Sequence, residues 1–135
     1  MDTKDTTLLR ILHYPPIDNL PPGSIRAQAH KDISLITLIP RTTSEGLQLK
    51  KQDQWLEIPF DKDWITLNIG DMLQEYTRGF YTSTSHRVLN PKIGENTARL
   101  SMPFFVHANN GEFISDRYPQ QELFLRERLA ENGVI

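Results

Sequence analysis

The sequence predicts a single, mainly β domain built as a sandwich or a barrel. At least seven short segments are rich in β-branched, aromatic or alternating apolar residues, which is the composition of strands. Proline, glycine and asparagine turns separate these segments at short intervals, and only two stretches have a helical pattern. All 135 residues are expected to form one domain.

The first half of the chain contains six predicted strands, several of them ended by a turn signal. Pro15-Pro16 ends the first strand, because proline cannot donate to a ladder. The β-branched segment SLITLI is typical of a buried strand and ends at Pro40. KQDQ is expected to be the tip of a hairpin. These strands cover residues 8–14, 24–29, 34–39, 47–50, 55–58 and 64–69.

The second half adds two strands and two helices. Gly70-Asp71 breaks the sixth strand, and Asp71 is expected to N-cap a short helix, MLQEYTR, with Gly79 after its end. Two further strands cover residues 81–89 and 97–106. An amphipathic helix is expected after Tyr118-Pro119 and ends at Asn132-Gly133.

Composition limits the classes of partner and location. Hydrophobic residues make up 38% and charged residues 24% of the chain, as in ordinary globular proteins. The net charge is −2 and no Lys/Arg run is present, so nucleic acid is not an expected partner. No apolar run is long enough to cross a membrane, and no membrane partner is expected. The absence of cysteine suits a cytoplasmic protein.

The segment Ala29-His30-Lys31-Asp32 is the first candidate metal site. Residues two apart on an extended segment point to the same side, with Cα atoms about 6.6 Å apart. His30 and Asp32 can therefore direct an imidazole nitrogen and a carboxylate oxygen toward one ion. A His-x-Asp pair is short enough to occur by chance, so a third ligand is needed.

His86 is the best candidate for the third ligand, on a late strand that a closed sheet could place beside the early ones. Two imidazoles and one carboxylate on one side of an ion form the site typical of non-haem Fe(II) oxygenases. A buried histidine bonded to a backbone carbonyl is the alternative interpretation of His86 alone. His13 and His107 are interpreted as non-ligands.

Arg99 and Ser101 are also two residues apart on a predicted strand. An arginine fork can hold a carboxylate through two parallel hydrogen bonds, and a serine hydroxyl can add a third. The alternative is an edge-strand arginine that stays in water.

These residues occur within longer motifs that resemble a known family. AHKDISLITLI, EGLQL, LNIGDMLQ, SxxHRVLNP and RLSMPFF follow one another as in the isopenicillin N synthase-like Fe(II)/2-oxoglutarate-dependent dioxygenases. The resemblance runs from about Leu8 to the last helix. It implies a double-stranded β-helix, a jelly-roll or cupin-like barrel, with one short inserted helix and a C-terminal helix.

The resemblance also implies roles for individual residues. His30, Asp32 and His86 match the iron ligands, and Arg99 and Ser101 match the pair that holds the distal carboxylate of 2-oxoglutarate. The segment RILHYPP resembles the family's Asn-Tyr-Tyr-Pro stretch, which makes Tyr14 a second co-substrate contact.

The RILHYPP segment also departs from the family pattern. Leu12 replaces the usual asparagine, and His13 replaces the first tyrosine. Phe105 is the candidate substrate contact, with an ordinary core aromatic as the alternative. Asn68 and Gly70-Asp71 are interpreted as structural.

The implied reaction couples decarboxylation of 2-oxoglutarate to succinate with oxidation of a small molecule by O₂ at Fe(II). Two alternatives remain open. One is an iron-dependent oxidase of the same family that does not use 2-oxoglutarate, and the other is a β-barrel binding module without catalysis.

Relatives carry an N-terminal region before the first core strand, and this chain begins just before that strand. The chain is therefore expected to be a fragment or a short gene product that lacks this region. It is also expected to expose apolar sheet surface and to self-associate or bind a partner there.

Overall fold

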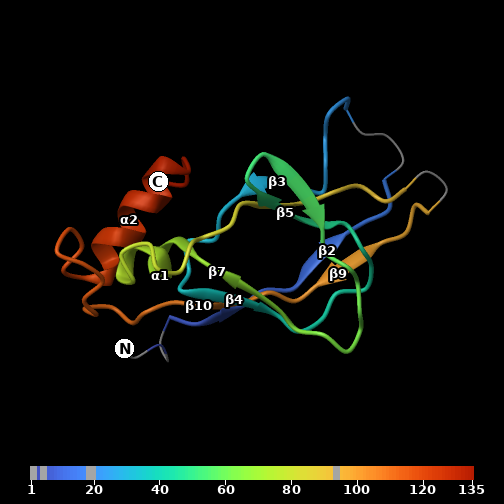
Figure 1. The fold of residues 1–135 in the computed structure, drawn as a ribbon. Helices are drawn as coiled ribbons and strands as arrows, with labels where there is room; N and C mark the ends of the chain where they lie inside the picture. Colours follow the sequence, from blue (N-terminus) through green and yellow to red (C-terminus); the bar gives the residue numbers. More distant parts are fainter. Residues whose placement is uncertain (1–2, 4–5, 18–20, 93–94) are drawn as a thin grey trace.

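The computed structural model describes residues 3, 6–17, 21–92 and 95–135. These residues form short strands in antiparallel sheets and two helices, which confirms the predicted mainly β class (Figure 1). The strands are β1 (Leu8–Leu9), β2 (Leu12–Tyr14), β3 (Ala27–His30), β4 (Ile36–Ile39), β5 (Leu47–Lys51), β6 (Gln54–Glu57), β7 (Thr66–Ile69), β8 (His86–Val88), β9 (Arg99–Ser101) and β10 (Phe104–Val106). The helices are α1 (Asp71–Tyr76) and α2 (Gln121–Glu131).

Two four-stranded sheets form the body of the molecule. One has the strand order β1-β10-β4-β7 and the other β3-β8-β5-β6, while β2 and β9 form a separate pair. The two larger sheets face each other, and both helices lie together at one end of them (Figure 1). This arrangement gives an interior between the sheets and two outer faces.

Both long strands predicted for residues 8–14 and 97–106 are wrong as single elements, because each is divided in two. Pro103 has no N–H to continue a ladder, and the neighbouring Met102 N–H donates to the Arg41 carbonyl instead, at 3.1 Å. The opposite segment divides at the same level, where the Arg10 N–H donates to the Pro103 carbonyl at 3.0 Å. The first half of each segment therefore pairs in a different sheet from the second half.

The strand predicted for residues 81–89 is also shorter than expected. Only His86–Val88 join a ladder. The preceding residues are bonded to α1 and the turn after it, since the Tyr81 N–H donates to Thr77 Oγ1 and the Ser83 N–H to Gln74 Oε1. Side-chain acceptors therefore replace the strand partner that this segment would need.

The predicted N-cap of α1 is wrong by one residue. Gly70 is the N-cap, and Asp71 lies in the first turn, where its negative charge interacts favourably with the helix dipole. Gly79 follows the helix with φ 83°, as predicted. The last helix ends before Asn132-Gly133, also as predicted.

The main apolar core lies at the helical end of the molecule. Its fully buried members include Met72 of α1, Phe124 of α2 and Ile114 of the segment between β10 and α2. Tyr118 and Phe124 pack edge to face with ring centroids 5.2 Å apart. No helix of the described chain has the length and apolar content needed to cross a membrane.

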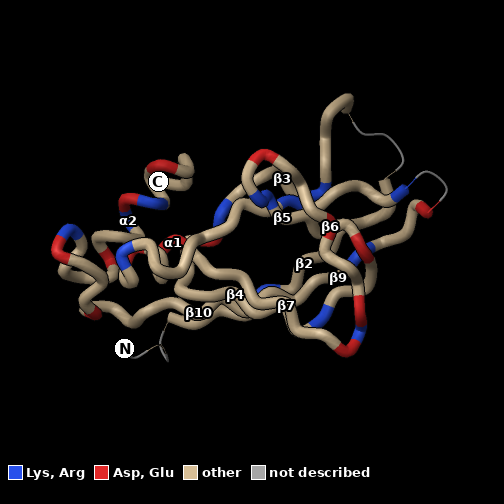
Figure 2. Tube along the Cα trace, viewed as in Figure 1, with Lys and Arg blue, Asp and Glu red and all other residues tan. Residues whose placement is uncertain are grey.

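The two outer faces differ in polarity. On the outer side of the β1-β10-β4-β7 sheet, cross-strand partners form two rows of apolar side chains. We call this surface the apolar face. Its residues are Leu9, Phe104, Leu38 and Leu67 in one row and Val106, Ile36 and Ile69 in the next. On the other sheet the corresponding rows contain Arg87, Gln48, Glu57 and Lys50 beside Trp55. Figure 2 shows charges of both signs interspersed along the described chain.

Gly70 allows two backbone segments to approach closely. The N–H groups of Gly70, Asp71 and Met72 donate to the carbonyls of Leu35, Asp32 and Ser34 at 2.9, 2.7 and 3.2 Å. A Cβ at position 70 would lie 2.0 Å from the Ser34 carbonyl oxygen, a backbone atom that cannot move independently. The start of α1 is thus joined to the segment that carries Asp32.

We expect Gly70→Ala to lower the free energy of unfolding by about 3 kcal/mol, because overpacking against backbone forces the two segments apart. Urea unfolding followed by circular dichroism measures the loss. Gly133→Ala is the control, since nothing lies within 4 Å of its Cβ position and only its φ of +68° opposes the change. That control should cost about 1 kcal/mol. Equal losses in the two variants would contradict the steric explanation.

Candidate metal centre and co-substrate cavity

The three predicted metal ligands lie together in the structure. His30 ends β3, and its cross-strand partner in β8 is His86, with ring centroids 4.3 Å apart. Asp32 follows two residues after His30, and its Oδ1 lies 3.8 Å from His30 Nε2 and 3.6 Å from His86 Nε2. One donor atom from each side chain lies within 4.8 Å of the other two.

Backbone carbonyls orient both imidazoles. His30 Nδ1 lies 2.8 Å from the Gln28 carbonyl oxygen, and His86 Nδ1 lies 3.2 Å from that of Thr84. A carbonyl only accepts, so in the neutral ring Nδ1 carries the hydrogen and Nε2 keeps its lone pair. Both Nε2 lone pairs are therefore available on the side where Asp32 lies.

The surroundings of Asp32 fit a bound cation. The residue is 7% exposed, and its Oδ2 has no hydrogen-bond partner among the described residues. A buried carboxylate oxygen without a donor is unfavourable, and a cation would compensate it. Burial lowers the pKa of His86, against the opposing effect of Asp32, which favours the neutral form that binds metals. Two nitrogens and one oxygen suit a ferrous ion and leave open positions.

Arg99 and Ser101 lie on the opposite wall and are 2% and 3% exposed. The alternative of an edge arginine in water is therefore wrong. Arg99 Nε donates to the Ser44 carbonyl at 3.3 Å, and Cζ lies 5.5 Å from the centroid of the Tyr14 ring. No acidic side chain of the described residues forms an ion pair with Arg99. Burial lowers its pKa, yet a guanidinium stays charged in proteins.

The pairing of β2 with β9 shows which of the two departures from the family pattern, Leu12 and His13, changes the cavity. Tyr14 is the direct partner of Arg99, and Leu12 is the partner of Ser101. Tyr14 and Leu12 both line the cavity, so leucine in place of asparagine makes this wall less polar. His13 is exposed on the other side of the strand, so its substitution does not change the cavity.

The candidate ligands and the arginine wall border one cavity of about 60 Å³. The predicted residues that line it are His30, Asp32, His86, Tyr14, Arg99, Ser101 and Phe105. Sequence reasoning missed Thr37, which is 1% exposed, lines the same cavity and exchanges a 3.0 Å hydrogen bond with Ser34. Its inward position in an alternating strand was the available signal.

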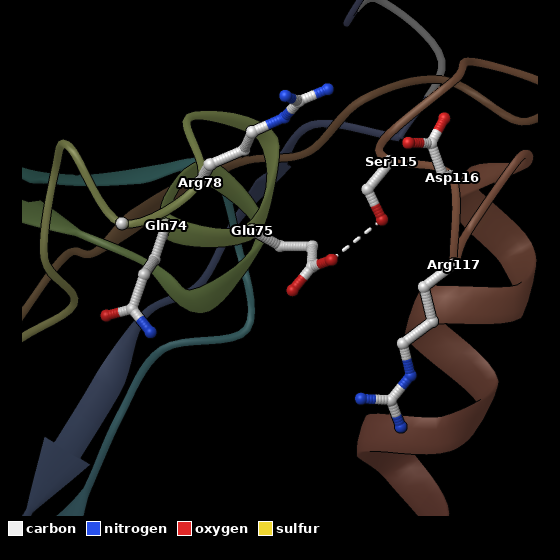
Figure 3. Close-up of a pocket in the computed structure, with 7 residues that line it drawn as sticks. Gln74, Glu75, Arg78, Ser115, Asp116 and Arg117 are labelled. Carbon is white, nitrogen blue, oxygen red and sulfur yellow. Dashed lines mark hydrogen bonds between the residues drawn. The ribbon is translucent and has the colours of Figure 1, made fainter.

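A larger hollow, of about 370 Å³, lies between the end of α1 and the segment before α2 (Figure 3). Its side chains pair with one another or with neighbours. Ser115 Oγ donates to Glu75 Oε1 at 2.7 Å, and Arg117 binds Glu127 at 2.6 Å. Arg78 and Arg117 point away from each other, so they do not converge on one ligand (Figure 3). The smaller cavity is the candidate site because its polar groups converge.

Residues 6–108 match the model of the 2OG-Fe(II) oxygenase superfamily, and the chain belongs to this family. It is 37% identical over 106 residues to the 2-oxoglutarate-dependent dioxygenase citB of Monascus ruber, covering 75% of this chain and 31% of that protein. It is 33% identical over 107 residues to the isopenicillin N synthase of Amycolatopsis lactamdurans, covering 78% and 31%.

A solved structure is also closely similar. A Shewanella oneidensis protein assigned as an oxygenase superposes with a TM-score of 0.84 at 49% identity, covering 96% of this chain and 49% of that one. The predicted family and the double-stranded β-helix fold are confirmed. The chain spans about a third of the length of these curated relatives and about half of this structure.

His107 lies outside the ligand cluster, in agreement with its interpretation as a non-ligand. Its Nδ1 lies 3.2 Å from the Thr6 carbonyl oxygen. Burial is the largest effect on its pKa and lowers it below the ordinary value of 6.5, while Thr6 and Asp32 raise it and Arg10 lowers it. The folded protein therefore holds this ring in its neutral form below the pH at which the unfolded chain protonates it.

We expect the metal-free protein to lose stability as the pH falls below about 6.5, because the unfolded chain binds the His107 proton first. Above that pH both states are neutral and the effect disappears. Urea unfolding at pH 7.5 and 5.5, with chelator, measures the difference. It should be smaller in His107→Gln, although His86 contributes with the same sign. An unchanged pH dependence in the variant would contradict the effect of burial.

Proposed function

We propose that this chain forms the catalytic core of an Fe(II)- and 2-oxoglutarate-dependent oxygenase that oxidises a small molecule. The observation that carries the proposal is the convergence of three donor atoms on one side of a cavity with a buried arginine on the other. The family assignment and the similarity to a 2-oxoglutarate-dependent dioxygenase support it.

His30, Asp32 and His86 would hold the iron through Nε2, Oδ1 or Oδ2, and Nε2. Bound iron with 2-oxoglutarate and O₂ would supply the oxidising chemistry, in which 2-oxoglutarate becomes succinate and CO₂. The two carbonyl hydrogen bonds at Nδ1 would hold each imidazole in a fixed orientation. Apolar side chains of Ile39, Leu47 and Val88 line the cavity and would limit its water content.

Arg99 would bind the carboxylate of 2-oxoglutarate farthest from the metal. Its guanidinium is buried, and a carboxylate would supply the missing opposite charge. The Ser101 hydroxyl and the Tyr14 side chain are placed to add hydrogen bonds, since β9 carries Ser101 two residues after Arg99 and β2 pairs Tyr14 with it. Phe105, on the same cavity wall, would contact the substrate.

An iron-dependent oxidase that does not use 2-oxoglutarate is the second candidate. The observation in its favour is 33% identity to an isopenicillin N synthase, close to the 37% identity to the dioxygenase. In that case Arg99 and Ser101 would bind a carboxylate of the substrate itself. A binding module without catalysis is the third possibility, which the same titration tests.

We expect anaerobic Fe(II) followed by 2-oxoglutarate to produce a weak metal-to-ligand charge-transfer absorption band. Asp32→Ala should abolish iron binding, and Arg99→Ala should weaken 2-oxoglutarate binding about a hundredfold, since a buried charge pair loses one partner. Arg126→Ala, an exposed residue of α2, is the matched control and should behave as wild type. Iron binding without the band would favour the oxidase, and no iron binding would favour the module.

We also propose that the isolated chain self-associates through the apolar face. Leu9 and Leu67 of this face are 48% and 53% exposed, and neither helix covers it (Figure 1). Contiguous apolar surface of this kind is covered in most stable proteins.

Sedimentation velocity should show a sedimentation coefficient that rises with protein concentration. Leu67→Lys should shift the protein toward the monomer, because it places a charge in the centre of the contact. Leu56→Lys, at a 43% exposed position of the other sheet, is the control and should not. A monomer at every concentration in the wild type would contradict the proposal.

A further inference from the structure

We propose that Arg10 binds a carboxylate of the substrate at the end of the cavity opposite Arg99. Phe105 would pack against the adjoining apolar part of the same molecule. The inference rests on the proposed oxygenase function, because it concerns the substrate of that reaction.

Arg10 lies between β1 and β2, and its guanidinium faces the ring of Phe105, a residue of the cavity wall. Leu12 and Tyr14 line the cavity, and Leu8 is the direct partner of Phe105, which also lines it. The Arg10 N–H donates to the carbonyl of Pro103, another residue of the cavity wall.

Arg10 contacts an aromatic side chain of the cavity wall. Its Cζ lies 5.7 Å from the centroid of the Phe105 ring, and the Phe105 centroid lies 6.5 Å from that of His107. Arg10 lowers the pKa of His107 through its charge, and Asp32 raises it. Arg10 is exposed and forms no ion pair with an acidic side chain of the described residues.

The two arginines contact different aromatic rings of the cavity wall, Arg99 that of Tyr14 and Arg10 that of Phe105. We therefore expect Arg10 to bind a different anion from the 2-oxoglutarate carboxylate proposed at Arg99. Arg10 supplies one positive charge, which matches a carboxylate better than a doubly charged phosphate.

The test compares matched acids and amides on protein loaded anaerobically with Fe(II) and saturating 2-oxoglutarate, which occupies Arg99. Phenylacetate and phenylacetamide form one probe pair, and hexanoate and hexanamide the other. Titration calorimetry should show each acid binding about tenfold more tightly than its amide, as expected for a charge-assisted pair that is partly removed from water. Arg10→Gln should remove this preference, and Arg10→Lys should retain part of it.

Arg126→Gln is the charge-matched control and should leave the preference unchanged. Equal or undetectable binding of acid and amide in the wild type would overturn the proposal, as would equal effects of the Arg10 and Arg126 variants. The charge-transfer band is recorded first on the same samples. Its absence identifies failure of the proposed function, whereas a normal band with no acid preference identifies failure of the Arg10 proposal alone.

Discussion

The backbone contact between Gly70–Met72 and Asp32–Leu35 is the constraint on which the site depends. Three consecutive N–H groups at the start of α1 donate to carbonyls of the segment that carries Asp32. This contact connects the apolar core, through the fully buried Met72, to Asp32, a candidate metal ligand that lies outside any strand. The backbone contact therefore holds the buried Asp32 carboxylate in place, although its Oδ2 has no hydrogen-bond donor among the described residues.

The cavity separates two kinds of unfavourable burial. One wall brings two imidazole lone pairs and a carboxylate together, and the other buries a guanidinium without an acidic partner among the described residues. Arg99 forms no ion pair with Asp32, and the strands that carry the two histidines belong to a different sheet from the strand that carries Arg99. A cation at the first wall and a carboxylate at the second would relieve both costs. The folded chain is thus complementary to a metal and an acid together. The site is pre-organised for both, at a cost in stability while it is empty.

Local spacing predicted the parts of the site that lie two residues apart in one segment, and strand pairing decided the rest. His30 with Asp32 and Arg99 with Ser101 follow from the period of two, whereas the position of His86 opposite His30 depends on a register that spacing does not contain. The sequence offered His86 as the best candidate because it lies on a late strand, and the resemblance to the family agreed with that choice. The division of the strands at Pro103 was visible in the sequence, since proline cannot donate. The length of β8 was not, because side chains of α1 and its following turn provide the competing acceptors. The core at the helical end was likewise hidden, since it depends on how distant segments pack.

The sequence identified Tyr14 as a candidate site residue but did not identify Arg10. Tyr14 belongs to a motif, whereas Arg10 has only its position two residues before Leu12. Arg10 has no acidic partner among the described residues, whereas on the other sheet Arg87 donates to Gln48. Because a charge on the cavity side is desolvated when a ligand enters, it is tolerated only where the ligand carries the opposite charge. Burial assigns Arg99 to one carboxylate, whereas the contact with Phe105 at the cavity wall assigns the exposed Arg10 to another.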